Sequence, residues 1–394
     1  MSYGVQLRDK GFNVVAVLWP VEPTIQPTSI SWDRRWREPG TFELIAPIQI
    51  PHLDQLTTLG NYIEMLKDGS SEALYRIEAA NLQTGIVHYQ QSIAGHINAI
   101  YAAGQGVGEL RNVVVRIDAD SVTSVGRMEG YVDARDVEEG DYPLLRQRAD
   151  AKLAEMETQG AFSTKAGEPT PSEVLKVTGR SLLLHAERRV IVPPPATSAA
   201  DIVDITGDAY DEDTDQADEV MKHYIDAHLV NPADAARTVA NFVIQGPIPA
   251  LAALTYQGRF GPVLEALQEI GKLSDSGFEV VLNAADEFEF QVKPRRDRTI
   301  DSTQPVVFRS TDVLLDVPGR EYRTNWDVGD LVTLEVATPS LQLDVTIMQV
   351  RHVLVPGKPE QVTVALDTPT ADDLERFRDA IVQLGKANTL AARA

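Results

Sequence analysis

The sequence predicts an α+β protein of several domains with at least two β-rich modules. The chain has 394 residues, which at about 100–200 residues per domain corresponds to two to four domains. Short runs rich in β-branched and aromatic residues occur toward both ends, whereas helical periodicity is concentrated between them. No internal repeat with a period of about 20–50 residues is present, so a repeat architecture is excluded.

Residues 1–85 are predicted to form β structure. Ile30, Trp32 and Trp36 alternate roughly with polar residues, as in a strand with one buried face. Pro39-Gly40 is expected to turn this strand into a hairpin partner that carries Phe42, and we expect Trp32, Trp36 and Phe42 to be core residues rather than interface anchors. The strand-like runs are Val14–Trp19, Ser29–Trp36, Thr41–Ile45, Asn61–Leu66 and Leu74–Ala80.

The middle of the chain mixes strands and helices. Asp141 is the expected cap of a helix that runs to about Glu157, with Leu145, Ala149 and Leu153 on one face. The other helices are expected at Ser181–Arg188, Ala217–Leu229 and Pro262–Leu273. Strands are expected at Ile97–Ala103, Val113–Ile117, Val174–Val177, Phe278–Leu282 and Phe288–Val292, with a polar connector at Ala161–Pro171.

The end of the chain is β-rich again and then helical. Thr370 and Asp373 form a capping-box arrangement, with Asp in place of the usual Glu, before apolar residues spaced by three and four. This helix could dock on the protein's own core or on a partner helix. The strands expected before it are Leu331–Val336, Leu341–Val350 and Gln361–Leu366.

Charge and composition exclude several classes of protein. Thirty-six basic against 58 acidic residues give a formal net charge of −22. This charge argues against a protein that coats nucleic acid, because phosphate binding needs clustered Lys and Arg, and against docking on an anionic membrane. The chain has no cysteine, so disulfides, thiolate metal sites and cysteine nucleophiles are excluded. We expect no signal peptide at Met1–Lys10 and no bilayer-spanning run, and therefore a soluble product.

Two segments have the composition of a ligand-binding motif but lack its defining features: a glycine-rich segment and an acidic segment. Gly104–Gly108 is expected to lead into a strand, whereas a dinucleotide fingerprint opens a helix, so a tight turn is the better interpretation. In the acidic segment 201–219, Asp211, Asp213 and Asp215 alternate like calcium ligands, but the glycine and glutamate of a calcium loop are missing. A solvated loop is expected there, with an adventitious calcium ion as the lesser alternative.

No catalytic set emerges from the sequence. His223 and His228 are five residues apart, not four as in a zinc hydrolase helix, and His185 is expected to be structural. No Gly-x-Ser-x-Gly elbow is present and nothing singles out a pair of carboxylates. Three arginine pairs are expected to form salt bridges: Arg34-Arg35, Arg188-Arg189 and Arg295-Arg296. The sequence therefore predicts no enzyme and assigns no catalytic, cofactor-binding or metal-binding residue.

Four sequence blocks nevertheless resemble a siphovirus minor-tail family found in many actinobacterial phages and prophages. The first block begins Ser-Trp-Asp-Arg-Arg-Trp and ends shortly before Pro47. Together the blocks span residues from about 5 to 350. They are Ser31–Leu44, Val177–Leu183 with Glu187–Ile191, Ala103–Arg111 with Tyr131–Asp136, and Asp327–Thr333.

The resemblance implies a tail-tip baseplate hub, a structural virion protein without enzymatic activity or cofactors. Each protomer would contribute two barrel-like β domains, so that a homotrimer matches the six-fold tail tube. The implied neighbours are a distal tail protein and the tube above, tip or fibre proteins below, and a tape-measure protein in the lumen, with DNA only in transit. The protein would be assembled in the host cytoplasm and located in the virion tail tip. The alternatives are a tail-associated peptidoglycan or glycan hydrolase and a cytoplasmic binding module.

The order of the blocks departs from the family. The block in Ile86–Gly167 comes early here, whereas in the family it directly precedes the block that begins at Asp327. The chain is therefore a natural rearrangement or is altered in some other way. We expect the strands of residues 97–117 to pair with those of 331–350. The resulting division is 1–85 plus 168–195 as a first β-barrel-like module, 86–167 plus 313–368 as a second β module with a helix, 196–312 as an α/β insertion, and 369–394 as a C-terminal helix.

Overall fold

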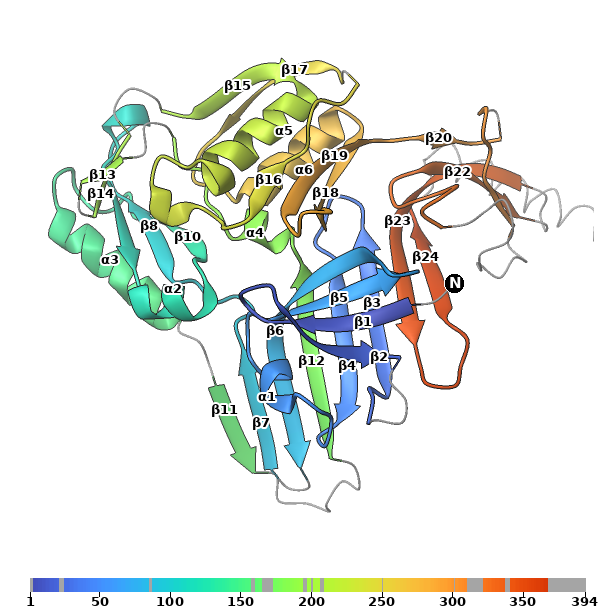
Figure 1. The fold of residues 1–394 in the computed structure, drawn as a ribbon. Coiled ribbons are helices and arrows are strands. Elements are labelled where there is room, and N and C mark those ends of the chain that lie inside the picture. Colours follow the sequence, from blue (N-terminus) through green and yellow to red (C-terminus); the bar gives the residue numbers. More distant parts are fainter. Residues whose placement is uncertain are drawn as a thin grey trace, which may run out of the picture. The chain divides into compact units, whose positions relative to one another are not determined.

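The computed structural model has the mixed α+β, strand-rich character that the sequence predicts (Figure 1). Its contacts divide the chain into two compact units. The first unit comprises Met1–Ile30 and Arg37–Lys293, and the second comprises Ser31–Trp36 and Pro294–Ala394. The structure describes residues 3–20, 25–84, 87–156, 160–164, 173–193, 197–199, 201–205, 209–249, 251–300, 302–309, 322–336 and 341–367.

A large antiparallel sheet in the first unit is organised around the long strand β6 (Ser70–Thr84). Along one edge, β5 (Tyr62–Lys67) pairs with the first half of β6 and β7 (Val87–Ser92) pairs with the second half. The opposite edge of β6 is occupied by β12 (Val174–Ser181). This sheet also contains the strands β1 (Tyr3–Arg8), β2 (Val14–Trp19), β4 (Thr41–Pro47) and β11 (Gly160–Thr164). In the described part of the chain, the ladder from β2 to β4 does not close on itself.

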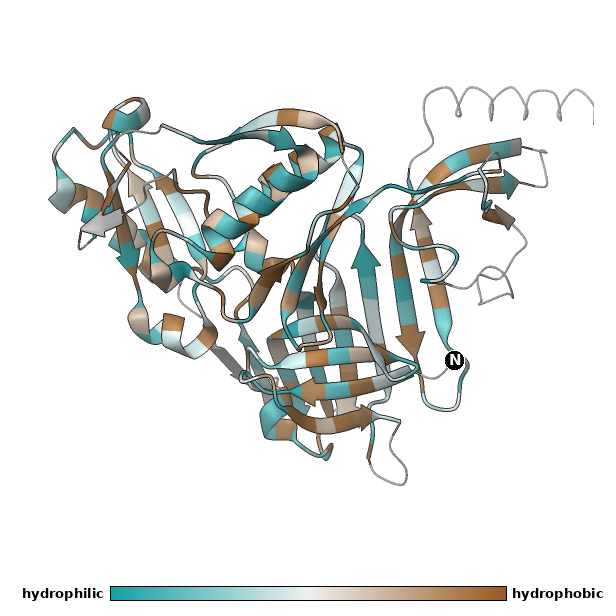
Figure 2. Ribbon diagram, turned by 45° about the horizontal axis from the view of Figure 1, so that its top comes forward, coloured by the Kyte–Doolittle hydropathy of each residue, from teal (hydrophilic) through white to brown (hydrophobic). Residues whose placement is uncertain are grey.

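Buried and half-buried residues alternate along β1 and β4, so that every second side chain faces the core. Figure 2 shows the corresponding hydrophobic (brown) and hydrophilic (teal) bands along the strands. Both strands of the expected Pro39-Gly40 hairpin form, as β3 (Ser29–Arg35) and β4. Trp32, Trp36 and Phe42 are buried, as predicted. The strand β1 was not predicted, although its residues alternate between buried and half-buried positions. A short helix, α1 (Leu53–Leu56), connects β4 to β5.

A second sheet of the first unit is covered by apolar side chains on both faces. Its strands β8 (Ala99–Ala103) and β9 (Val113–Ile117) are antiparallel, and α3 (Tyr142–Glu155) packs on one face (Figure 1). Ile100 and Ala102 contact the side of α3, whereas Tyr101 and Ala103 join the cluster on the other face. The remaining strands are β10 (Glu129–Asp133), β14 (Ile202–Asp204) and β13 (Thr197–Ala199).

The helix α3 begins where the sequence predicts. The carboxylate of Asp141 accepts a hydrogen bond from the Leu144 backbone N–H at 3.1 Å, which satisfies a donor that the first helical turn leaves open. Leu145 and Ala149 are buried against the sheet and Leu153 packs beside them. The periodicity and the cap together therefore located this helix correctly.

The expected pairing of residues 97–117 with 331–350 is wrong. One edge of β8 is occupied by β10 and the other by β9, and the outer edge of β9 pairs with β14. Strand β8 therefore has no free edge, and β22 (Leu331–Val336) pairs instead with β23 (Leu341–Leu354) in the second unit.

Two amphipathic helices form the main apolar core of the first unit. They are α5 (Ala217–Ile225), which continues as a π-helix over Asp226–Val230, and α6 (Val263–Leu273), with Pro262 as its N-cap residue. Both were predicted, as were β18 (Ser276–Leu282) and β19 (Phe288–Pro294). Three more strands lie in the same stretch of the chain: β15 (Asp211–Gln216), β16 (Phe242–Ile244) and β17 (Ala253–Gly258). The shorter helices of the first unit are α2 (Ala119–Val125), α4 (Leu184–Glu187), η1 (Gly108–Leu110) and η3 (Ala235–Arg237).

The acidic segment 201–219 is not the solvated loop that its composition suggests. Asp211–Gln216 forms β15, which pairs with β17, and helix α5 begins directly after it. Asp211 and Asp218 are buried, each with an exposed fraction of 1%. The run of carboxylates misleads because alternate residues of a strand face opposite sides, and the inward carboxylates find partners.

The second unit is a smaller β structure with its own core. β22 and β23 are antiparallel, and β24 (Gln361–Leu366) pairs with β23. Short parallel strands line the other edge of β22, namely β20 (Asp297–Arg298) and β21 (Val307–Arg309). The backbone N–H of Trp36 donates to the carbonyl oxygen of Met348 at 2.8 Å, so the segment Ser31–Trp36 lies beside β23.

Some expectations fall outside the described residues. They are the capped helix that begins near Thr370 and residues 165–171 of the expected connector. Residues 161–164 of that connector belong instead to strand β11. Among the residues that the structure describes, no helix has the length and apolar character to cross a bilayer.

Candidate functional site

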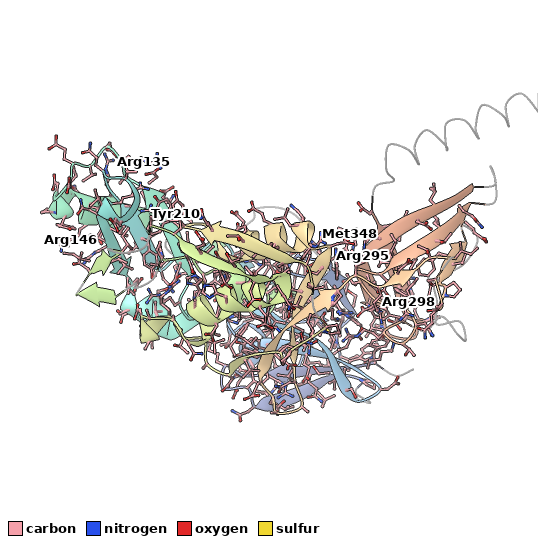
Figure 3. All side chains as sticks on the ribbon, turned by 90° about the horizontal axis from the view of Figure 1, so that it is seen from above. Arg135, Arg146, Tyr210, Arg295, Arg298 and Met348 are labelled. Carbon is pink, nitrogen blue, oxygen red and sulfur yellow. The ribbon has the colours of Figure 1, made fainter. Side chains whose placement is uncertain are left out.

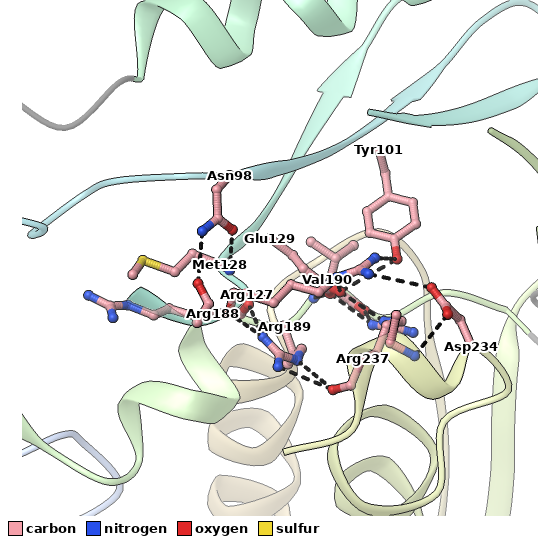
Figure 4. Close-up of polar contacts among 12 residues, drawn as sticks. Asn98, Tyr101, Arg127, Met128, Glu129, Arg188, Arg189, Val190, Asp234 and Arg237 are labelled. Atoms are coloured by element: carbon pink, nitrogen blue, oxygen red, sulfur yellow. Dashed lines mark hydrogen bonds and ion pairs between the residues drawn. The ribbon is translucent and has the colours of Figure 1, made fainter. Parts of the chain in front are cut away.

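A buried cluster of charged side chains joins three segments of the first unit, and we call it the charged junction (Figure 4). Glu129 begins β10, Arg189 follows α4, and Arg237 ends η3, so residues far apart in sequence converge. Arg127 is the fourth residue of the charged junction. Each of the four has an exposed fraction of 8% or less.

Glu129 is the only acidic member of the junction's four residues and it accepts from several donors. Arg237 binds both of its carboxylate oxygens at 2.9 Å, and Arg127 Nε binds Oε1 at 2.8 Å. The backbone N–H of Val190 donates to Oε2 at 3.0 Å. Burial by itself would raise the pKa of Glu129, but the facing guanidinium groups, Arg237 first among them, hold it at about 2. The carboxylate is therefore ionised at neutral pH.

Arg189 differs from the other arginines of the junction because its side chain donates to backbone carbonyl oxygens and not to the carboxylate of Glu129. Its Nη1 binds the carbonyl of Arg127 at 2.6 Å and its Nη2 binds the carbonyl of Arg237 at 3.1 Å. Burial lowers the pKa of Arg189 to about 10. The guanidinium thus holds two loops together while its charge is balanced only through the neighbouring Glu129.

Beside the junction lies a cavity of about 360 Å³, which we call the basic cavity. The side chains that line it include five cations and no carboxylate among the described residues. The five are Lys10, Arg76, Arg127, Arg188 and Arg189. His185 lines it as well, at the edge of the apolar core, where its ring stacks on Phe288 with centroids 6.0 Å apart. Burial and the surrounding arginines lower the pKa of His185 well below its ordinary value, so the ring is neutral.

Two buried nitrogen atoms at the basic cavity have no hydrogen-bond partner in the described structure. They are Nη1 of Arg188 and Nε2 of His185. Arg188 has an exposed fraction of 7%, and burial lowers its pKa to about 10 even though Glu78 binds its other terminal nitrogen. Buried donors are nearly always paired in folded proteins, so these two atoms require an explanation.

A second polar cluster surrounds the inward carboxylate of β15. His223 Nε2 lies 2.7 Å from Oδ1 of Asp211, and His228 Nε2 lies 2.8 Å from Oδ2. The five-residue spacing reaches one carboxylate because the helix widens to a π-turn, with Asn231 N–H bound to the carbonyl of Asp226 at 2.7 Å. The two histidines hold the pKa of Asp211 at about 2 against the effect of burial. The two hydrogen bonds make the cluster a clasp between α5, its π-helical extension and β15. No group of three potential metal ligands is found among the described residues.

In the second unit, two of the sequence blocks meet. Gly329 has a φ of +92°, and a Cβ there would overlap the ring of Trp36. Arg34 Nη1 binds Oδ1 of Asp327 at 2.6 Å. Position 329 requires glycine because the indole of Trp36 covers it and leaves no space for a Cβ. The Trp-Asp-Arg-Arg-Trp block and the Asp-Val-Gly-Asp block therefore pack against each other.

The other residues that the sequence drew attention to have structural places. Gly104–Gly108 is a turn between β8 and β9, in which Gly106 has a φ of +121° and a Cβ would lie 2.5 Å from the carbonyl oxygen of Leu110. The tight-turn interpretation is therefore confirmed. Salt bridges form at Arg34, Arg35, Arg188 and Arg296.

The junction and the cavity were missed by sequence reasoning. Arg188-Arg189 was noticed only as a short basic pair, and nothing in the sequence connects it to Glu129. Exposed arginines give the same composition, as Arg135 and Arg146 show at the surface of the α3 part (Figure 3). The one available signal was the position of the arginine pair directly after an apolar helical run.

Comparison with known proteins gives a family match. Residues 163–314 match the model of the Siphovirus ReqiPepy6 Gp37-like protein family. A search of curated proteins finds no match. The match confirms the resemblance that the sequence blocks indicate: the chain is similar to a siphovirus tail protein family.

Solved structures of phage tail proteins are similar to this chain over nearly its full length. The tail protein of Neisseria meningitidis MC58 is 9% identical, with a TM-score of 0.39 and coverage of 93% of this chain and 97% of that one. The 43 kDa tail protein of prophage MuSo2 from Shewanella oneidensis is 8% identical, with a TM-score of 0.41 and coverage of 93% and 97%. Prophage tail protein gp18 of Listeria monocytogenes EGD-e is 8% identical, with a TM-score of 0.38 and coverage of 97% and 98%.

Proposed function

We propose that this protein is a baseplate hub of a siphovirus tail tip, in which three copies adapt the six-fold tube to a three-fold tip. The match of residues 163–314 to a siphovirus family carries the proposal, because it supports a structural tail protein. The described fold is compatible with it, since each of the two units is rich in strands and has its own apolar core. Three chains with two β-rich units each would supply six comparable surfaces to the tube.

The charge of the chain suits a passage for DNA. Three copies would carry 3 × (−22) = −66 formal charges. Where those charges face a lumen, they repel DNA phosphates, so the genome slides through without binding. The proposed neighbours are the distal tail protein and tube above, tip or fibre proteins below and the tape-measure protein inside.

Two measurements test the hub proposal. Light scattering of the purified protein should give the mass of a trimer, alone or after addition of a neighbouring tail protein. Symmetry-resolved electron microscopy of particles should place three copies at the tail tip. A hexameric ring of this chain, or its location in the tube or head, would contradict the proposal.

The hydrolase alternative predicts turnover of purified cell wall, because a glycosidase needs two converging carboxylates. No carboxylate lines the basic cavity in the described structure, and the raised pKa of Asp330 arises from its burial while the group remains bound to Arg296 at 2.7 Å. We expect no release of soluble fragments from cell wall by the purified chain. Release that disappears on substitution of a named acidic pair would favour the alternative.

A further inference from the structure

The basic cavity carries more positive charge than its surroundings compensate. Arg127 and Arg188 each bind a carboxylate, Glu129 and Glu78 respectively. The remaining cations, Lys10, Arg76 and Arg189, make their recorded hydrogen bonds to backbone carbonyl oxygens.

Those backbone contacts leave net charge in place. Lys10 Nζ donates to the carbonyl of Ser124 at 2.7 Å, and Arg76 donates to the carbonyl of Val125. No ion pair is recorded for Lys10 or Arg76 among the described residues. A carbonyl dipole satisfies an N–H but does not neutralise a charge, so the charges of Lys10 and Arg76 both remain uncompensated at this cavity.

The cations also repel one another across the cavity. Burial and the nearby Arg76 lower the pKa of Lys10, and Arg76 likewise contributes to the lowered pKa of Arg188 after burial itself. Like charges that face one another in a partly buried space repel, and an anion between them would relieve this repulsion. The side chains of the cavity therefore carry positive charge that the neighbouring carboxylates compensate only in part.

The backbone around the cavity leaves room for a ligand. Gly60 has a φ of +94°, and a Cβ there would lie 3.1 Å from Cε of Lys10 and 3.3 Å from Nη2 of Arg76. Gly126 has a φ of +76°, and a Cβ there would lie 3.7 Å from the same arginine atom. These glycines let the two cations approach the chain closely. The volume of about 360 Å³ lies within the range of small-ligand sites, about 300–1,000 Å³.

We propose that the basic cavity binds a phosphate-type oxyanion, as inorganic phosphate or as the phosphate group of a small monoester. Arg188, whose buried Nη1 has no partner among the described residues, lines the cavity together with Arg76, and their guanidinium forks suit the oxygens of a phosphate. Two cations without carboxylate partners, Lys10 and Arg76, favour a dianion over a singly charged carboxylate, and a phosphate group carries about −1.5 to −2 at neutral pH. The bound anion would tie the turn after β1 and strand β6 to the 122–127 segment and to the residues that follow α4.

Calorimetric titration of the full chain with inorganic phosphate tests the proposal, with sodium chloride keeping the ionic strength constant. We expect saturable binding and a higher melting temperature in phosphate than in chloride. Glycerol phosphate in a parallel titration distinguishes a monoester ligand from the free ion, since tighter binding of either identifies the source. Acetate should bind more weakly than both. Equal binding of acetate and phosphate, or no binding of phosphate, would overturn the proposal.

Two variants connect the binding to the cavity. Lys10→Gln and Arg76→Gln should each weaken phosphate binding about tenfold or more, because each removes a charge-assisted hydrogen bond. Lys152→Gln and Arg148→Gln remove the same charges from the exposed face of α3 and should leave the binding unchanged. Lys10 is exposed at the rim, so Lys10→Gln keeps the test valid if Arg76→Gln destabilises the fold. Unchanged binding in Lys10→Gln would place the anion elsewhere and overturn the assignment.

Discussion

Leu267 and Glu129 are both buried in the first unit, but their surroundings are opposite. Leu267 lies on α6 in a cluster of apolar side chains, whereas Glu129 accepts from two arginines and a backbone N–H. The apolar cluster is held by many interchangeable contacts, so its stability scales with the area buried. The junction depends on a complete set of partners, because each missing partner leaves a buried charge. Substitutions should therefore act gradually in the first region and abruptly in the second.

The largest effect is expected for Glu129→Gln. The amide would present N–H groups to Arg127 and Arg237 and leave buried positive charge uncompensated, so the free energy of unfolding should fall by about 3–5 kcal/mol. Urea unfolding followed by fluorescence measures it. The matched control is Glu155→Gln at the exposed end of α3, which should change stability by less than about 0.5 kcal/mol. A loss below about 1 kcal/mol in Glu129→Gln would mean that the junction contributes little.

Leu267→Ala should cost about 2–5 kcal/mol, depending on how far the core closes around the cavity that it leaves. Leu267 is fully buried, whereas Leu273 on the same helix is 71% exposed. Leu273→Ala is therefore the control and should be nearly neutral. Equal losses in the two variants under the same urea titration would show that α6 does not pack as described.

Lowering the pH should reduce the free energy of unfolding through His185, which lies at the edge of the apolar core. Because burial and neighbouring arginines lower its pKa in the folded state, the unfolded chain binds more protons below about pH 6.5. Its contribution to stability is present above that pH and is lost as the pH falls toward the folded-state pKa. The variant His185→Phe should flatten the fall in unfolding free energy between about pH 7 and 5, whereas His52→Gln at an exposed position should not.

His223 should act in the opposite direction. Its hydrogen bond to Asp211 raises its pKa in the folded state, so its contribution is complete at low pH and is lost as the pH rises through that value. His223→Gln should therefore lose more stability at about pH 5.5 than at about pH 8.5. A larger loss at the higher pH would contradict the clasp at β15.

The smallest effect is expected at the cap of α3. Asp141→Ala removes the acceptor for the Leu144 N–H and should cost about 1 kcal/mol. Glu139→Ala, an exposed change two residues earlier, is the control. Thermal unfolding monitored by circular dichroism can resolve the difference, and identical melting temperatures would argue against the cap.

The elements that the sequence predicted correctly depend on local chemistry. α3 has a capping aspartate and an apolar face, α6 begins after a proline, and the turn at Gly106 needs a residue that tolerates a positive φ. These signals lie within a few residues of the structure that they determine. Residues 211–216 were misread because composition indicated a loop, while their pairing with residues 253–258 decides the outcome.

The missed features all involve partners distant in sequence. Strand β8 selects β9 and β10 rather than β22, and no local pattern distinguishes these apolar partners. Glu129 and Arg237 are separated by 108 positions, and their roles follow only when the segments around them meet. The family resemblance was confirmed because it compares whole blocks rather than local propensities, but it did not give the correct strand partners.

The widened turn at Asp226–Val230 makes the chain sensitive to length at this point. Removing one residue would let the segment relax to an α-helix, a gain in local geometry. The same deletion would rotate everything after it by about 100°, and His228 would turn away from Asp211. The contact between His228 and Asp211 of β15 therefore favours the present number of residues in this helix. Insertions or deletions within it should be tolerated less readily than substitutions.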